Sequence, residues 1–127
     1  MPVRHPVAAG RPEAGPVVTK AVVRAADQLC LTARILASVI GVSEATVSRM
    51  KRGEFDLEPG TKPFELGVMF VRLFRSLDAI VGGDNAVAAA WIANSNTVLD
   101  ARPIEKLQTV SGLVDVIAYL DARRALV

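Results

Sequence analysis

Residues 33–52, which read ARILASVIGVSEATVSRMKR, carry the most informative pattern in the chain. A small residue, Ala37, stands where the second of two crossing helices must pass close to the first, and Gly41 follows where the chain turns. Glycine takes the left-handed turn conformation at little steric cost. Ser43 then suits the N-cap of the second helix, whose free N–H groups and positive dipole end can face a DNA phosphate. The stretch therefore predicts a helix-turn-helix with helices at 33–40 and 44–52.

The second of these helices is the predicted DNA-recognition helix. Arg49 is the best candidate for reading a base, because its guanidinium matches O6 and N7 of guanine in the major groove. Ser43 and Ser48 are short enough to reach base edges or phosphates, and Lys51 and Arg52 are expected to hold phosphates. The alternative reading is a helical hairpin with a solvated basic face, or one that contacts only protein. The predicted DNA-binding residues are Ser43, Glu44, Ala45, Thr46, Ser48, Arg49, Lys51 and Arg52.

Charge is distributed unevenly on the two sides of residue 53, although the net charge of the chain is only +2. Residues 1–53 carry eight Lys or Arg and three Asp or Glu, whereas residues 54–127 carry seven and ten. A positive segment favours phosphate backbones through counterion release and electrostatic steering. The acidic and apolar remainder suits contact with protein, so the two parts are expected to face different partners.

Outside the motif, apolar residues recur every three or four positions, which is the helical period, and no segment alternates as a strand would. The expected fold is therefore all-α. Residues 1–16, which hold four of the seven prolines, are expected to be a flexible leader. A helix-turn-helix domain at 17–60 and a small helical bundle at 61–127 follow. Further helices are expected at 17–29, 61–81, 85–93 and 111–125, with a short turn beginning at Pro103.

Several classes of function are excluded by the composition. Cys30 is the only cysteine and His5 the only histidine, which rules out a disulfide framework, a Cys/His metal site and a His-based catalytic triad. No glycine-rich phosphate loop is present, so neither an enzyme nor a cofactor is expected. The longest apolar run, Ala86 to Ala93, has eight residues, against roughly 20 in a membrane helix. No signal-peptide pattern opens the chain, and we expect a cytoplasmic protein without membrane contact.

Most large apolar side chains are expected to lie in the core. Trp91 stands at helical spacing among alanines, and such a tryptophan belongs to a core more often than to an interface. Cys30, beside the end of the first helix, is expected to be a small buried residue. The same core assignment, with a dimer contact as the second reading, applies to Phe64, Met69, Phe70 and Phe74.

A second pattern lies in the C-terminal half and can be written Trp91-x4-Asn96-x2-Leu99-x3-Pro103-x3-Leu107-x4-Gly112. With Ala88, Ala90, Val116 and Leu120 around it, this order resembles the toxin-binding domain of the Xre/MbcA/ParS antitoxins. Together with the helix-turn-helix, the resemblance covers about Val17 to the C-terminus. The family often has a glycine shortly before the proline, where this chain has Asp100 and Ala101, and another near the end of the last helix, where it has Ala125.

The resemblance implies an all-helical antitoxin of a type II toxin-antitoxin system. Its partner would be a RES-domain toxin, which consumes NAD or uses it for ADP-ribosyl transfer. In such pairs the C-terminal domain, here 61–127, binds and blocks the toxin, and the N-terminal domain represses their shared operon. Reading a palindromic operator through the major groove needs two recognition helices about 34 Å apart, so a homodimer is expected.

The C-terminal tail is the expected toxin contact if the end of the chain reaches the toxin pocket. Guanidinium groups suit the carboxylates and phosphate-binding groups of an NAD site, which makes Arg123 and Arg124 the natural anchors. The equally weighted alternative is that the pair complements the dipole of the last helix. The predicted toxin-binding residues are Arg123, Arg124, Ala125, Leu126 and Val127.

Two other functions remain open from the sequence. The chain can be a stand-alone transcriptional regulator whose C-terminal helices only dimerise. It can also be an adaptor whose helix-turn-helix no longer binds DNA. A neighbouring reading frame that encodes a toxin favours the antitoxin, and salt-dependent binding to its own promoter excludes the adaptor.

Overall fold

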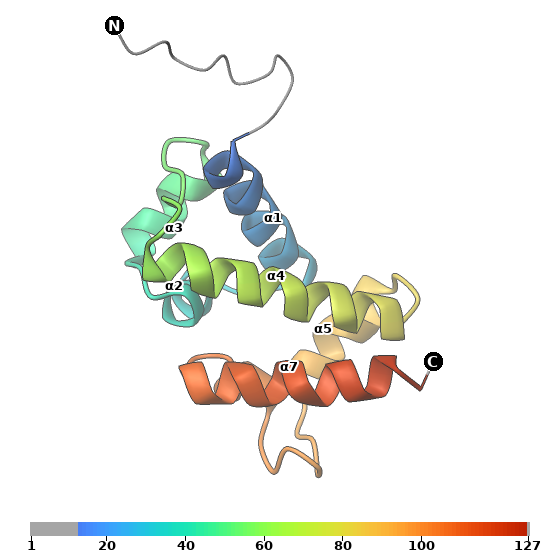
Figure 1. Ribbon diagram of the computed structural model, residues 1–127. Coiled ribbons are helices and arrows are strands. Elements are labelled where there is room, and N and C mark those ends of the chain that lie inside the picture. Colours follow the sequence, from blue (N-terminus) through green and yellow to red (C-terminus); the bar gives the residue numbers. More distant parts are fainter. Residues whose placement is uncertain (1–12, 127) are drawn as a thin grey trace, which may run out of the picture.

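The computed structural model describes residues 13–126, and within that range the chain forms seven helices and no strand (Figure 1). The all-α expectation is therefore confirmed. Residues 1–12, most of the expected leader, lie outside the described residues, as does Val127. The helices are α1 (Ala14–Gln28), α2 (Ala33–Ile40), α3 (Glu44–Lys51), α4 (Lys62–Ile80), α5 (Asn85–Ala93), α6 (Pro103–Lys106) and α7 (Val110–Arg124).

The helix-turn-helix forms where local chemistry requires it. Thr32 caps α2, with its hydroxyl accepting the N–H of Ile35 at 3.2 Å. Gly41 ends α2 with φ of 74°, a left-handed conformation that glycine adopts without strain. Ser43 caps α3, and α3 ends at Lys51 with Arg52 as its C-cap, one residue earlier than expected.

The first helix begins three residues before its predicted start, and a distant contact explains the difference. Thr19 donates a hydrogen bond to the carbonyl of Gly15 at 2.8 Å and accepts one from the N–H of Leu57 at the same distance. Gly15 is buried so closely against Leu57 that a Cβ would come within 2.7 Å of the carbonyl oxygen. The loop after α3 therefore holds the first turn of α1 in place, although local sequence there resembles a leader.

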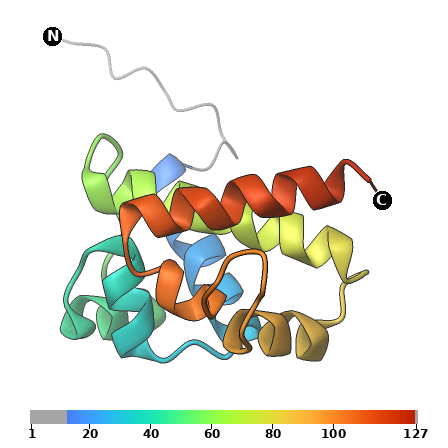
Figure 2. The same ribbon diagram turned by 90° about the horizontal axis from the view of Figure 1, so that it is seen from below.

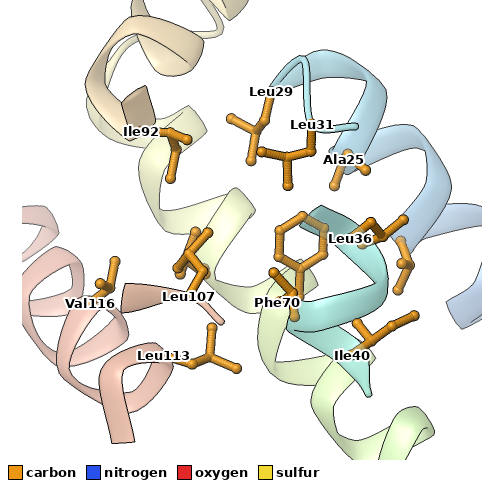
Figure 3. Close-up of a cluster of buried hydrophobic side chains, with 14 of the residues drawn as sticks. Ala25, Leu29, Leu31, Leu36, Ile40, Phe70, Ile92, Leu107, Leu113 and Val116 are labelled. Atoms are coloured by element: carbon orange, nitrogen blue, oxygen red, sulfur yellow. The ribbon is translucent and has the colours of Figure 1, made fainter. Parts of the chain in front are cut away.

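Helix α4 is the central element of the fold. It packs against α1 and α2 on one side and against α7 on the other, and α4 and α7 run in the same direction (Figures 1 and 2). Phe70 of α4 is fully buried and lies among Ala25, Leu36 and Ile40, while Leu107 lies toward the α7 side of the same cluster (Figure 3). The N-terminal and C-terminal helices therefore share one continuous core through α4.

Most residues of the C-terminal sequence pattern have a structural role in the segment from α5 to α7, where they close a turn or pack between helices. The side-chain oxygen of Asn96 accepts the N–H groups of Val98 and Leu99 at 2.9 and 3.1 Å, which closes a tight turn. Pro103 opens α6 and is buried, and Leu107 is fully buried. Gly112 lies so close to the end of α6 that a Cβ would overlap the backbone carbonyl of Lys106.

The structure corrects the expectation for Cys30 and for the start of α7, and it places Trp91 at the edge of the core. Cys30 is exposed rather than buried, because it occupies the turn after α1 with φ of 58°, which directs its side chain away from the core. Trp91 is half-buried on α5 and packs against the edge of the core, so its expected core position is confirmed in part. Thr109 caps α7, so this helix begins at Val110 rather than at Ser111. None of the helices within 13–126 combines the length and hydrophobicity of a membrane-spanning segment.

Candidate nucleic-acid interface and C-terminal surface

One face of α3 anchors the helix and the other is open. Val47 and Met50 are buried against the rest of the N-terminal helices. The predicted DNA-binding residues all lie on α3 or its caps and none of them is buried. Thr46 and Ser48 are half-buried, and the exposed members of the set are Ser43, Glu44, Ala45, Arg49, Lys51 and Arg52.

The Ser43 side chain organises the start of α3. Its hydroxyl accepts the N–H of Thr46 at 3.0 Å and donates to the Thr46 hydroxyl at 2.9 Å. The N–H groups at the very start of a helix have no partner within it, so those of Glu44 and Ala45 point outward. The positive end of α3 is thus available to an anion, with the Glu44 carboxylate beside it as the local source of negative charge.

Arg49 is held in place by two contacts. One of its terminal nitrogens donates to the Thr46 hydroxyl at 3.2 Å. Its guanidinium carbon lies 5.3 Å from the centre of the Phe55 ring, within the range of a cation–π contact. The guanidinium is therefore oriented before any ligand binds. Phe55 is not among the residues predicted from the sequence, because the loop after Gly53 gives no local sign that it folds back onto α3.

Arg52 is partly neutralised. Its Nε lies 3.1 Å from a carboxylate oxygen of Glu54, and both side chains are more than half exposed. An exposed pair of this kind contributes little stability and is easily broken. Arg52 can therefore reach a phosphate only in competition with Glu54, whereas Lys51 has no ion pair within the described residues.

The end of α7 carries an aromatic and cationic cluster on the side of α5. The rings of Trp91 and Tyr119 are stacked, with centres 6.0 Å apart and planes at 16°. The guanidinium of Arg123 lies 5.9 Å from the Tyr119 ring and donates to its hydroxyl at 3.3 Å. We call Trp91, Tyr119 and Arg123 the Trp–Tyr–Arg cluster. Tryptophan, tyrosine and arginine are the residues most enriched at energetically important protein contacts.

Arg124 faces a different side of α7, toward α4. It donates to the hydroxyl of buried Ser76 on α4 at 3.5 Å. Ser76 in turn donates to Asp121 at 3.0 Å, and the same carboxylate is paired with Arg72. The two predicted anchors are therefore not brought together, because Arg123 belongs to the cluster and Arg124 to the seam between α4 and α7. Leu126 is 84% exposed, Ala125 is exposed, and Val127 lies outside the described residues.

Comparison with protein families gives two matches along the chain. Residues 8–72 match the family described as the antitoxin Xre-like helix-turn-helix domain. Residues 76–125 match the antitoxin Xre/MbcA/ParS C-terminal toxin-binding domain. The two matches meet within α4, the helix through which the two halves share their core. No curated protein matches the chain.

Proposed function

The chain belongs to the Xre-like antitoxins with a C-terminal toxin-binding domain, and from this premise we propose that it neutralises a RES-type toxin and represses its own operon. The toxin would be one that degrades NAD or transfers ADP-ribose. Both activities would reside on one chain and operate in the cytoplasm, where the operator lies. In this proposal the antitoxin has no catalytic role and acts by covering the active site of the toxin and the operator DNA.

The observation that carries DNA binding is the pre-organised Arg49 on an open α3. A side chain already held by Thr46 and Phe55 loses less conformational entropy when it meets a base. The positive start of α3 and the exposed Lys51 support contacts to flanking phosphates. In this proposal Arg49 reads a guanine, and a homodimer reads the two halves of a palindrome.

For the toxin contact, the Trp–Tyr–Arg cluster and the tail are the favoured surface. Arg123 is exposed, and within residues 13–126 the hydrogen bond and the cation–π contact of its guanidinium are both made with Tyr119, so it can leave that ring for a carboxylate of the toxin. The tail beyond it, Ala125 to Val127, would follow into the same pocket. Arg124 is assigned to hold α7 against α4 through Ser76 rather than to contact the toxin directly.

The test is co-expression with the protein encoded by the neighbouring gene while cell growth and NAD level are followed. The wild type is expected to restore both. Arg123→Ala, or removal of residues 125–127, is expected to lose neutralisation while operator binding in a gel-shift assay is retained. Arg49→Ala is expected to give the opposite result, with neutralisation kept and operator binding lost by on the order of tenfold or more.

The outcomes separate the remaining alternatives. A neighbouring protein that is harmless when expressed alone would exclude a RES-type toxin as the partner and would favour a stand-alone regulator. Full neutralisation by the Arg123→Ala and tail-deleted chains would place the toxin contact elsewhere on the C-terminal helices. Retention of specific, salt-dependent operator binding by Arg49→Ala would remove this residue as the base reader.

A further inference from the structure

A groove distinct from α3 and the C-terminal tail runs between α1 and α4. Two hollows open there, and they form one continuous depression because they share the lining residues Val17, Ala21, Val71 and Arg75. We call this depression the α1–α4 groove.

The floor of the groove is apolar and partly open to solvent. Val17 of α1 and Val68 of α4 line the first hollow together, and they are 45% and 44% exposed. Val71 and Phe74 of α4 are half-buried and continue the apolar lining into the second hollow. The groove therefore offers apolar surface that a partner could cover.

Cations from three helices line the same groove. Lys20 and Arg24 come from α1, Arg72 and Arg75 from α4, and Arg124 from the end of α7. All five side chains belong to exposed residues. No Asp or Glu of the described part of the chain lines either hollow. The groove therefore combines an apolar floor with a strongly positive lining.

Most of this positive charge is not neutralised. Arg72 is paired with Asp121 of α7. The acidic residues of α1 and α4 themselves, which are Asp27, Glu65 and Asp78, line neither hollow. No ion pair within residues 13–126 involves Lys20, Arg24, Arg75 or Arg124. An acidic occupant would therefore gain several ion pairs without breaking a buried one.

The length of the groove indicates the size of its occupant. Seven residues separate Val17 from Arg24 on α1, and Val68 from Arg75 on α4. At 1.5 Å per residue the groove extends about 10 Å along each helix. One carboxylate or phosphate is suited to one guanidinium fork, so a single small anion would leave most of the cations unpaired. A segment of two or more helical turns with several acidic side chains matches both the length and the charge.

We propose that the α1–α4 groove binds an acidic amphipathic helix of another protein. The apolar stripe of that helix would cover Val17, Val68 and Val71, and its glutamates or aspartates would pair with the cations of α1 and α4. This inference goes beyond the proposed function, since it requires neither the operator nor the Trp–Tyr–Arg cluster.

Three other occupants match the groove less well. A two-fold contact between copies of the chain would bring the same cations against themselves, and like charges oppose such a contact. Residues 1–12 of the same chain carry Arg4 and Arg11 and no acidic residue, so the groove would repel them. The phosphates of DNA would pair with the arginines, but they have no apolar group to cover the exposed valines.

Fluorescence anisotropy with the full chain and labelled synthetic peptides tests the proposal. The acidic peptide is a helix of about four turns, with leucines every three or four residues and glutamates on both sides of that stripe. One control peptide has glutamine in place of every glutamate, and the other has the same composition in an order that breaks the stripe. The wild type is expected to bind the acidic peptide about tenfold or more tightly than either control.

Substitutions in the groove test charge and apolar contact separately. Arg75→Glu removes and reverses a cation, and Val68→Asp places a charge on the apolar floor; each is expected to weaken binding of the acidic peptide by about tenfold or more. The matched controls outside the groove are Lys62→Glu and Val98→Asp, at side chains that are 85% and 73% exposed. Both controls are expected to bind as the wild type does, and circular dichroism checks that every variant remains helical.

A charge exchange tests the same contact by a change in preference. A further peptide has lysine in place of every glutamate, and the wild type is expected to prefer the acidic peptide strongly. Arg24→Glu combined with Arg75→Glu is expected to reduce that preference by about a hundredfold, because the affinities for the two peptides change in opposite directions.

The same measurements can overturn the proposal. Equal affinities for the acidic peptide and its two controls would show that the groove does not select an acidic amphipathic helix. Affinities unchanged by Arg75→Glu and Val68→Asp would place the peptide elsewhere on the protein. A wild type that sediments as a dimer, and as a monomer in both of these variants, would assign the groove to a second copy. Loss of operator affinity in Arg75→Glu, with no binding of the acidic peptide by the wild type, would assign it to DNA phosphates.

Discussion

Replacement of Gly112 by alanine is expected to destabilise the protein although it increases the helix propensity of α7. Alanine is favoured over glycine inside a helix by about 1 kcal/mol. At residue 112, however, a Cβ would overlap the carbonyl oxygen of Lys106 and lie 2.8 Å from its carbon and from the Thr109 hydroxyl. Two of these three atoms belong to the backbone, so no side chain can simply rotate away.

The loss of stability in Gly112→Ala depends on which parts of the structure must move to admit the new methyl group. The junction of α6 and α7 would have to open, and it is flanked by Leu107 and Leu113, both fully buried. Overpacking of this kind costs about 3 kcal/mol, the upper part of the usual range, because the obstruction is backbone. After the gain in propensity, Gly112→Ala is expected to lose about 2 kcal/mol in the free energy of unfolding. For a chain of this length the melting temperature would fall by roughly 8 °C.

Chemical unfolding followed by circular dichroism at 222 nm measures this difference. Ala118→Gly is the matched control, because Ala118 is exposed on the same helix and its replacement tests propensity alone. It is expected to lose about 1 kcal/mol. A Gly112→Ala protein as stable as the wild type, or more stable, would refute the close approach of α6 and α7. The glycine of the C-terminal pattern would then have to be explained by binding rather than by packing.

Three further predictions concern α3 and the turn before α6. Phe55→Ala is expected to weaken operator binding by about threefold, because it removes a cation–π contact of roughly 0.5–1 kcal/mol that orients Arg49. Phe55→Tyr retains the ring and is expected to bind the operator as the wild type does. Fluorescence anisotropy measures both affinities, and an equal operator affinity of the two variants would contradict the role of the ring. Glu54→Gln removes the ion pair of Arg52, so this arginine becomes free to contact a phosphate. Operator affinity should then rise, and the slope of log K against log salt concentration should steepen by about 0.9. An unchanged slope would show that Arg52 contacts no phosphate. Asp100 has a φ of 54°, a left-handed conformation that glycine adopts more easily than alanine. The Asp100→Gly protein is therefore expected to be more stable than the Asp100→Ala protein by about 1 kcal/mol in thermal unfolding. Equal melting temperatures of the two variants would contradict this.

The parts of the fold that the sequence predicts correctly are those controlled by neighbouring residues. Thr32, Ser43 and Asp84 each accept a helical N–H three residues later, and Gly41 ends α2, so α2 and α5 have the predicted bounds. Capping and turn chemistry act within one turn of helix, where sequence spacing is also spatial distance. The position of α3 and its outward face follow from the same local rules.

The parts of the fold that the sequence does not predict depend on contacts between segments that lie far apart in the sequence. Thr19 meets Leu57 across 38 positions of sequence, and this contact determines where α1 begins. Phe55 reaches Arg49 because the loop folds back, and Trp91 meets Tyr119 because α5 packs beside α7. No periodicity within a single helix encodes such contacts, since hydrophobic spacing gives the buried face of a helix but not its neighbour.

The two arginines near the C-terminus illustrate the same limit within one helix. Adjacent residues of an α-helix point about 100° apart, so a basic pair does not form one anchor. Tyr119, one turn before Arg123, takes that guanidinium toward α5, while buried Ser76 takes Arg124 toward α4. The two readings of the pair, toxin contact and structural support, therefore need not compete. The buried side chains of Leu113, Val116 and Leu120 seat α7 on the core, Arg124 adds a hydrogen bond to Ser76 at the end of that seam, and Arg123 stays exposed on the side of α5.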